Sequence, residues 1–194
     1  MSLEKQQVYD SLQLFQINTM TKYQTGKALK DIVGAEFEAH TGRVPEIFGL
    51  KPRKYKVQDC FNADHILHNT QGKVVAIEED KGHYVDACFF KRAVLSFAEV
   101  ALSYNERGEE CPYLILSSVT RFKGYEEKFE SHLRLLDKDI RKILREKMRY
   151  FYLVDHDRYK RSDWFPNSSS PLDGGKNLDA NIEELMQFYR SLQC

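Results

Sequence analysis

The chain has 194 residues, of which 42% are apolar and 30% are charged, a composition typical of one folded domain with its own hydrophobic core. Its 29 basic and 29 acidic residues give no net charge, which argues against a protein that coats nucleic acid without specificity. No apolar run reaches the roughly 18 residues of a membrane-spanning helix, and no secretory segment opens the chain. The four cysteines lack zinc-binding spacing, so free thiols in a reducing cytoplasm are expected.

The first strong pattern is a helix predicted over 26–40. Its apolar residues fall on one side of the helix and comprise Ala28, Leu29, Ile32, Val33 and Phe37. Glu36 lies near the centre of this apolar stripe, whereas Glu38 lies nearly opposite. A carboxylate on a buried face requires a partner. That partner is either a nearby base, such as Lys30 or His40, or a group of a functional site.

The most informative pattern lies in the segment 58–92. Asp64 is placed on a predicted strand, which a polar turn over 69–72 joins to an apolar run over 74–77 typical of a buried central strand. Four charged residues follow this run, Glu78, Glu79, Asp80 and Lys81. The strand is predicted to end there, at a turn over 82–83. Charges at the end of a buried strand are costly unless neutralised, and Mg²⁺ is a suitable partner because it binds carboxylate oxygens.

The alternation of strand side chains assigns these charges to faces. Glu79 and Lys81 share one face, whereas Glu78 points to the other, although a β-bulge would exchange the two glutamates. The hairpin then brings Asp64 near Glu79 and Lys81. Two carboxylates for a metal ion and one ammonium group for a water molecule are what metal-assisted phosphodiester hydrolysis requires. The alternative is an ordinary strand that ends in a solvated acidic turn.

The order Asp64, fourteen residues and then Glu79-x-Lys81 resembles the PD-(D/E)xK motif of restriction-endonuclease-like nucleases, with Ala63 in place of the usual proline. The resemblance implies that Asp64 and Glu79 bind a catalytic Mg²⁺, for which Mn²⁺ substitutes. It implies that Lys81 orients or deprotonates the attacking water. It also implies a supporting catalytic role for Glu36 in the first helix.

Downstream of the motif, the pattern alternates between helix and strand, over 84–104, 112–119, 124–149 and 150–154. The strand over 112–119 is expected to run parallel to the one before it, because a full helix separates them. In the early turns of the first of these helices, Lys91 and Arg92 are either phosphate contacts or ordinary surface charges.

The segment 156–176 differs in composition from the rest, combining basic and aromatic residues with serine, proline and glycine. It is either a DNA-recognition loop, with Arg158, Lys160 and Arg161 as contacts, or an unstructured connector. A closing helix is predicted over 177–194.

Together these patterns predict an α/β fold, a mixed central β-sheet flanked by helices, in a single domain over 1–194 with a catalytic core over 26–155. The resemblance implies a Mg²⁺-dependent type II restriction endonuclease. It would cut a specific site in double-stranded DNA, in the cytoplasm and away from membranes. Cleavage of both strands by so small a chain implies a homodimer. A structure-specific repair or recombination nuclease of the same superfamily is one alternative. A non-catalytic binding protein, with 78–81 as a surface charge patch, is the other.

Overall fold

The structure is a computed structural model that describes residues 3, 6–7, 45–53, 56–57, 61–120, 124–154 and 178–193. It describes the backbone but not the side chains at 52–53, 56–57, 61–62, 80–84, 119–120, 153–154 and 178–179. The predicted helix over 26–40 and the predicted recognition segment over 156–176 lie outside the described residues.

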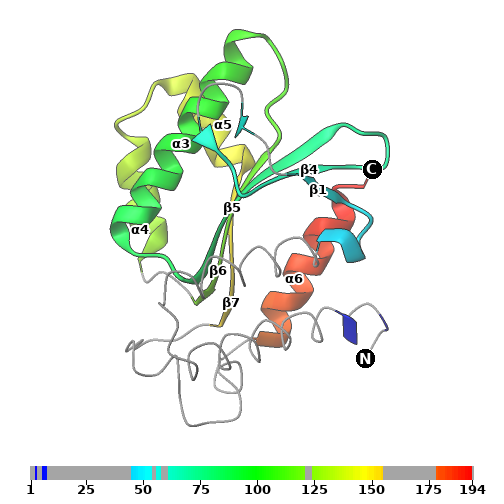
Figure 1. The fold of residues 1–194 in the computed structure, drawn as a ribbon. Coiled ribbons are helices and arrows are strands. Elements are labelled where there is room, and N and C mark those ends of the chain that lie inside the picture. The colour runs from blue at the N-terminus through cyan, green and yellow to red at the C-terminus, as the bar shows by residue number, and fades with distance from the viewer. Residues whose placement is uncertain are drawn as a thin grey trace.

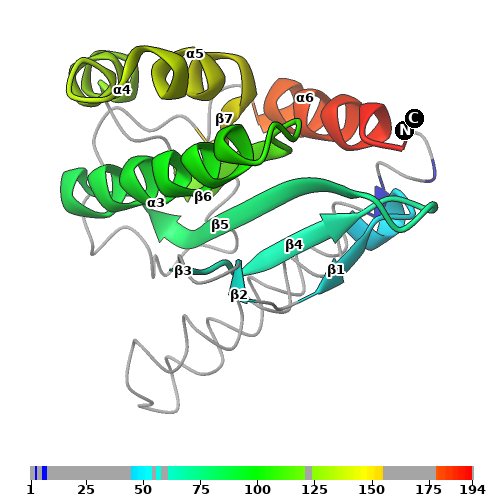
Figure 2. The ribbon, with the colours of Figure 1, turned by 90° about the horizontal axis from the view of Figure 1, so that it is seen from above.

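A five-stranded mixed sheet lies at the centre of the fold, in the order β1-β4-β5-β6-β7 (Figures 1 and 2). Its strands are β1 Lys51–Arg53, β4 His65–His68, β5 Val74–Tyr84, β6 Tyr113–Thr120 and β7 Met148–Val154. β4 pairs antiparallel with both β1 and β5, whereas β5, β6 and β7 are parallel. Two short strands, β2 Lys56–Val57 and β3 Phe61–Asn62, form a separate antiparallel pair.

Helices cover both faces of this sheet. Those described are α3 Ala87–Glu106, α4 Tyr125–Leu133, α5 Lys138–Lys147 and α6 Leu178–Ser191. In Figure 1, α3, α4 and α5 lie to one side of β5, β6 and β7, and α6 lies to the other. The predicted α/β class with a mixed, helix-flanked sheet and the predicted parallel pairing are therefore confirmed. In the described part of the chain, every helix is too short or too polar to cross a membrane.

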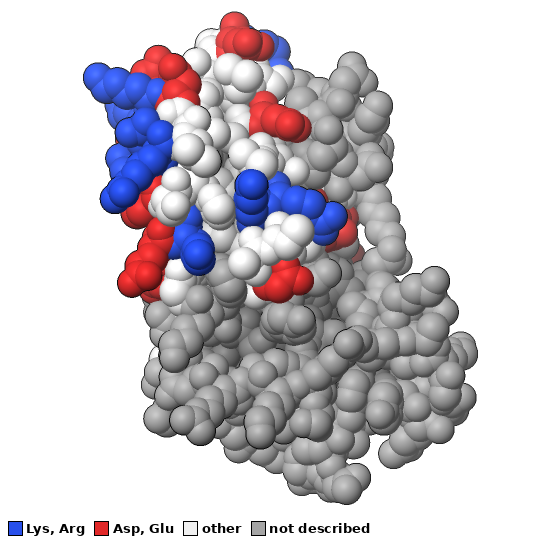
Figure 3. Space-filling model, turned by 90° about the vertical axis from the view of Figure 1, so that its left-hand side faces the viewer, with Lys and Arg blue, Asp and Glu red and all other residues white. Residues whose placement is uncertain are grey.

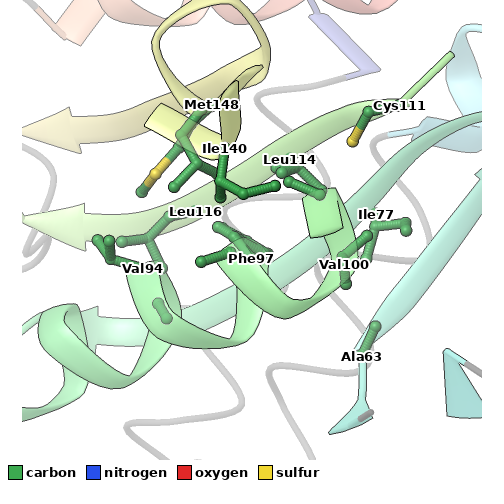
Figure 4. Close-up of a cluster of buried hydrophobic side chains, with 14 of the residues drawn as sticks. Ala63, Ile77, Val94, Phe97, Val100, Cys111, Leu114, Leu116, Ile140 and Met148 are labelled. Atoms are coloured by element: carbon green, nitrogen blue, oxygen red, sulfur yellow. The ribbon is translucent and has the colours of Figure 1, made fainter. Parts of the chain in front are cut away.

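Each face of the sheet has its own hydrophobic core. The core under α3 and α5 is drawn in Figure 4 and includes Ile77, Val94, Phe97, Leu116 and Ile140. The core under α6 includes Leu67, Ala76, Ile115, Phe151 and Met186. Burial of each of these larger side chains contributes about 1.5–3 kcal/mol, so both cores hold the strands in place.

The helix α3 is amphipathic and has a defined start. The Asp86 side chain accepts a 2.7 Å hydrogen bond from the backbone N–H of Phe89, which caps the helix. Its buried residues, Phe90, Ala93, Val94, Phe97, Ala98, Val100 and Ala101, recur at helical spacing. The predicted helix over 84–104 is thus present, shifted by two or three residues toward the C-terminus.

The predicted single helix over 124–149 is wrong, because α4 and α5 are separate helices. Asp137 starts α5, and its side chain accepts a 2.9 Å hydrogen bond from the backbone N–H of Asp139. Leu133, at the end of α4, and Ile140, in the first turn of α5, are both buried in the core under α3. The seven-residue separation of these apolar residues is the same as in a continuous helix, so periodicity alone does not reveal the break.

The predicted turn over 82–83 is also wrong, because β5 continues to Tyr84. The charged residues after Ile77 are part of the strand, and their backbone pairs with β6 as far as Lys81 opposite Ser118. The register shifts only between Lys81 and Tyr84. A parallel neighbour on one side therefore supports β5 beyond the point where β4 stops.

Candidate active site on strands β4 and β5

The pairing of β4 with β5 determines where Asp64 and Glu79 lie. His65 is opposite Glu78, and Ile66 is opposite Ile77. Asp64 lies at a bend one residue before β4, not within the strand as predicted. Continued by one residue, the register sets Asp64 opposite Glu79. Opposed residues of antiparallel strands have Cβ atoms about 4.5–5.5 Å apart and point to the same face, so the backbone favours a paired arrangement of these carboxyl groups.

This pair belongs to the α3 face of the sheet. Ile77 contributes to the core under α3, whereas its neighbour Ala76 contributes to the core under α6. Because side chains alternate along a strand, Glu79 follows Ile77 to the α3 face. The side chains of Asp64 and Glu79 are both half-buried. Glu79 lies midway along β5, opposite Leu116 of β6, and Asp64 lies just before the first residue of β4.

Glu78 has a different environment on the α6 face. It is 1% exposed, and its Oε1 atom accepts hydrogen bonds from Ser117 Oγ at 3.3 Å and from Tyr189 Oη at 3.1 Å. These bonds connect β5 to β6 and to α6. Between Ala76 and Lys81, β5 pairs with β6 in unbroken register, so no bulge exchanges the faces of Glu78 and Glu79. The two neighbours therefore lie on opposite faces, as strand alternation predicts.

His65 adds a second buried polar group beside Glu78. It is 4% exposed and directly opposite Glu78 in the ladder, so both belong to the α6 face. Its Nδ1 atom hydrogen-bonds to the main-chain oxygen of Asp64 at 2.8 Å. This bond restrains the backbone at the bend that carries Asp64. Sequence analysis missed this residue, although a histidine next to a candidate ligand was a usable signal.

Lys81 lies two residues beyond Glu79 in β5, and its backbone is opposite Ser118 of β6. Ser118 is buried, and its Oγ atom is 2.9 Å from Tyr150 Oη. The Tyr150 ring in turn packs against Tyr125, at a centroid distance of 4.9 Å, and against Tyr152, at 5.7 Å. The edge of the sheet near Lys81 thus carries hydroxyl and aromatic groups that sequence analysis did not single out.

The predicted phosphate contacts Lys91 and Arg92 lie in the second turn of α3 and are exposed. The Arg92 guanidinium carbon is 5.5 Å from the centre of the Phe89 ring. This cation–π contact restricts the orientations of the Arg92 side chain. Burial lowers the pKa of nearby His132, and the positive charges of Lys91 and Lys128 lower this pKa further. Lys91 on α3 and Lys128 on α4 are therefore close enough to His132 to act on it electrostatically.

The remaining predicted site residues lie outside the described residues, namely Glu36, Arg158, Lys160 and Arg161. Within the part of the chain that is described, no group of three or more His, Cys, Asp or Glu side chains is arranged to hold a metal ion. Two carboxylates are nevertheless a suitable donor set for Mg²⁺. This ion usually keeps several waters and is bound through one or two carboxylates together with phosphate oxygens.

Comparison with protein-family models finds no match, and comparison with curated protein sequences finds no significant match.

Proposed function

We propose that this protein is a Mg²⁺-dependent endonuclease that hydrolyses phosphodiester bonds of double-stranded DNA, as the PD-(D/E)xK nucleases that its motif resembles do. The main support is the β4–β5 register, in which His65 is opposite Glu78, so that its continuation by one residue would bring Asp64 opposite Glu79. Lys81 follows two residues later in the same strand, toward the carboxyl edge of the sheet. Glu78 is buried and Glu79 is half-buried, which disfavours the alternative of a surface charge patch over 78–81.

In the proposed reaction, the residues of the motif are two metal ligands and one group that orients water. Asp64 and Glu79 would bind Mg²⁺, which supplies Lewis-acid stabilisation of the phosphate when bound. The Lys81 ammonium group would orient the attacking water and stabilise negative charge that develops on the phosphate oxygens. Glu36 would support the water or the lysine. These groups perform chemistry on any phosphodiester, so they do not themselves select a DNA sequence.

DNA binding is assigned to basic residues outside the motif. Lys91 and Arg92 are exposed on α3, the helix that follows β5, and would contact backbone phosphates, which fix the position of the duplex. We assign base recognition to 156–176, through Arg158, Lys160 and Arg161. The protein would then be a type II restriction enzyme, which cleaves a specific DNA sequence. It would act in the cytoplasm as a homodimer in which each subunit cuts one strand.

Digestion of a sequenced plasmid tests the activity and its specificity together. With Mg²⁺ or Mn²⁺ the wild-type protein should give discrete fragments, and EDTA should abolish cleavage. Asp64→Ala and Lys81→Ala should each lower the cleavage rate at least about 10³-fold, because they remove a metal ligand and a transition-state contact. Glu127→Gln, an exposed residue of α4, is the matched control and should cut normally.

The outcomes of the digestion separate the alternatives. Cleavage restricted to branched, nicked or mismatched DNA would indicate a repair or recombination nuclease. The absence of cleavage of any DNA, together with no Mn²⁺ binding by electron paramagnetic resonance, would contradict a nuclease and favour a binding protein. Parental activity of Asp64→Ala would show that the motif is not the active site.

A further inference from the structure

On the α3 face of the sheet, the three parallel strands change from apolar to polar residues at nearly the same level. Rows of paired residues cross β5, β6 and β7. The first row is apolar, belongs to the core under α3 and comprises Ile77, Leu114 and Met148. Two residues further along each strand, the second row comprises Glu79, Leu116 and Tyr150. The third row comprises Lys81, Ser118 and Tyr152. Polar residues therefore continue from the candidate site on β5 across β6 to β7.

Two hydroxyl groups join the second row to the third. Ser118 is 6% exposed, and its Oγ atom is 2.9 Å from Tyr150 Oη. Tyr150 belongs to the row of Glu79, and Ser118 belongs to the following row. The tyrosine side chain therefore leans from β7 toward β6 and toward the carboxyl ends of the strands. There, Ser118 is directly opposite Lys81, and adjacent strands are about 4.8 Å apart. The hydroxyl pair thus lies beside the strand that carries the motif.

Aromatic neighbours hold the Tyr150 ring in place. Its centroid is 6.2, 4.9 and 5.7 Å from the ring centroids of Phe90, Tyr125 and Tyr152, respectively. Such tilted and edge-to-face contacts fix the plane of a ring as well as its position. Tyr150 is only half-buried, so part of this residue is accessible to solvent, whereas Ser118 is buried. Of the two hydroxyl-bearing residues, Tyr150 is therefore the one that a ligand can reach.

A hydroxyl group at this place is suited to an anionic ligand. A hydroxyl has one proton and two acceptor lone pairs, so Tyr150 can accept from Ser118 and also donate to another acceptor. Hydrogen bonds to charged oxygens, such as those of a phosphate, are stronger than bonds to neutral acceptors. Surface charge is less selective, because basic and acidic side chains are both exposed on the side of the molecule where α3 and α4 lie (Figure 3).

We propose that Tyr150 contacts the substrate, donating a hydrogen bond from Oη to a phosphate oxygen at the candidate active site. Ser118 is a positioning residue, which donates from Oγ to Tyr150 Oη and so directs the tyrosine proton toward the phosphate. Two hydroxyl groups bonded in series polarise each other, which strengthens the bond to the phosphate. This inference rests on the proposed function, because it assigns one more contact with the DNA backbone to the same site.

Cleavage kinetics with Mg²⁺, on a duplex oligonucleotide that contains a mapped cleavage site, test this proposal. Tyr150→Phe should lower kcat/KM about 10- to 100-fold, because a hydrogen bond to a charged group is lost. Ser118→Ala should lower kcat/KM about 3- to 10-fold, and combining it with Tyr150→Phe should add little, because the two hydroxyl groups act in series. Tyr104→Phe, at a half-buried tyrosine near the end of α3, is the matched control and should cut as the wild type does.

Replacing a phosphate oxygen by sulfur separates a substrate contact from a structural role. The wild type should cut the two phosphorothioate stereoisomers at different rates. Tyr150→Phe should change the ratio of these rates at least about threefold, because the bond to one of the oxygens is absent.

Circular dichroism should show that the variants are folded. If Tyr150→Phe does not fold, Ser118→Ala should show the same change in the ratio. An unchanged ratio would assign the hydroxyl pair a structural role and overturn the inference. A wild type that cuts DNA no faster than Tyr150→Phe would overturn this inference alone. A wild type that cuts no DNA would contradict the proposed function, and this contact with it.

Discussion

Glu78 and Glu79 are consecutive residues of β5 with opposite environments. Glu78 is 1% exposed on the α6 face, where hydroxyl groups of Ser117 and Tyr189 bind its carboxylate. Glu79 is half-buried on the α3 face, where the register continued by one residue brings it opposite Asp64. The comparison indicates that the two faces of one strand have different roles. At these two residues, the α6 face contributes hydrogen bonds that hold β5 in position, and the α3 face presents the carboxylates to which we assign chemistry.

Neutralising each glutamate in turn is the strongest way to break this comparison. Glu79→Gln should lower the DNA cleavage rate at least about 10³-fold, because an amide binds Mg²⁺ more weakly than a carboxylate does. Glu78→Gln should lower this rate less than about tenfold, because the amide oxygen still accepts from both hydroxyl groups. Cleavage rates and urea unfolding should be measured for both. Equal losses of activity would show that the two faces do not have separate roles.

The second largest effect is expected on stability, when the hydroxyl group of Tyr189 in α6 is removed. Tyr189→Phe deletes one donor to the buried Glu78 carboxylate, which should lower the free energy of unfolding by about 1–3 kcal/mol. Tyr113→Phe is the matched control, because Tyr113 is only half-buried and lies at the first residue of β6. This substitution should change the free energy of unfolding by no more than about 0.5 kcal/mol. If urea titrations give the two variants the same stability, the bond to Glu78 does not help to hold β5.

The smallest effect on stability is expected for Glu110, an exposed carboxylate outside the sheet. The hydrogen bond from Lys147 to Glu110, at 2.7 Å, lowers the pKa of Glu110. The contribution of this bond to the free energy of unfolding is therefore fully present above the unfolded-state pKa of about 4.3. It is lost as the pH falls through the lower pKa of the folded state. Glu110→Gln should cost no more than about 1 kcal/mol at pH 7, since water screens this pair. In urea titrations, the difference in unfolding free energy between Glu110→Gln and the wild type should vanish near pH 3. A difference that persists at this pH would show that the ionised Glu110 carboxylate is not its cause.

The parts of the fold that sequence predicted best are those with a strong local pattern. The apolar repeat of α3 and the apolar runs of β5 and β6 determine buried faces without help from distant residues. The polar turn before Val74 likewise indicates the hairpin that sets Asp64 opposite Glu79. The roles assigned to those two residues and to Lys81 remain predictions.

Two of the differences arose where a distant segment decides the outcome, and one arose from a local capping bond. β5 continues through Gly82 and His83 because β6 lies beside it, and β6 begins only at Tyr113. The division of the helix at Asp137 leaves the apolar spacing unchanged and depends on a capping bond instead. Tyr189 was not expected near Glu78, since the two residues are 111 positions apart and no local pattern links them.

The bond between Tyr189 and Glu78 also affects when β5 becomes stable during synthesis. After Glu78 is added, the ribosome must join 111 further residues before the hydroxyl group that binds its carboxylate exists. Until then, Leu67, Ala76 and Ile115 have no α6 to cover them, so a nascent chain exposes one side of its sheet. The strand that carries Glu79 therefore matures late in translation, and a chain interrupted before α6 would be a target for chaperones and proteases.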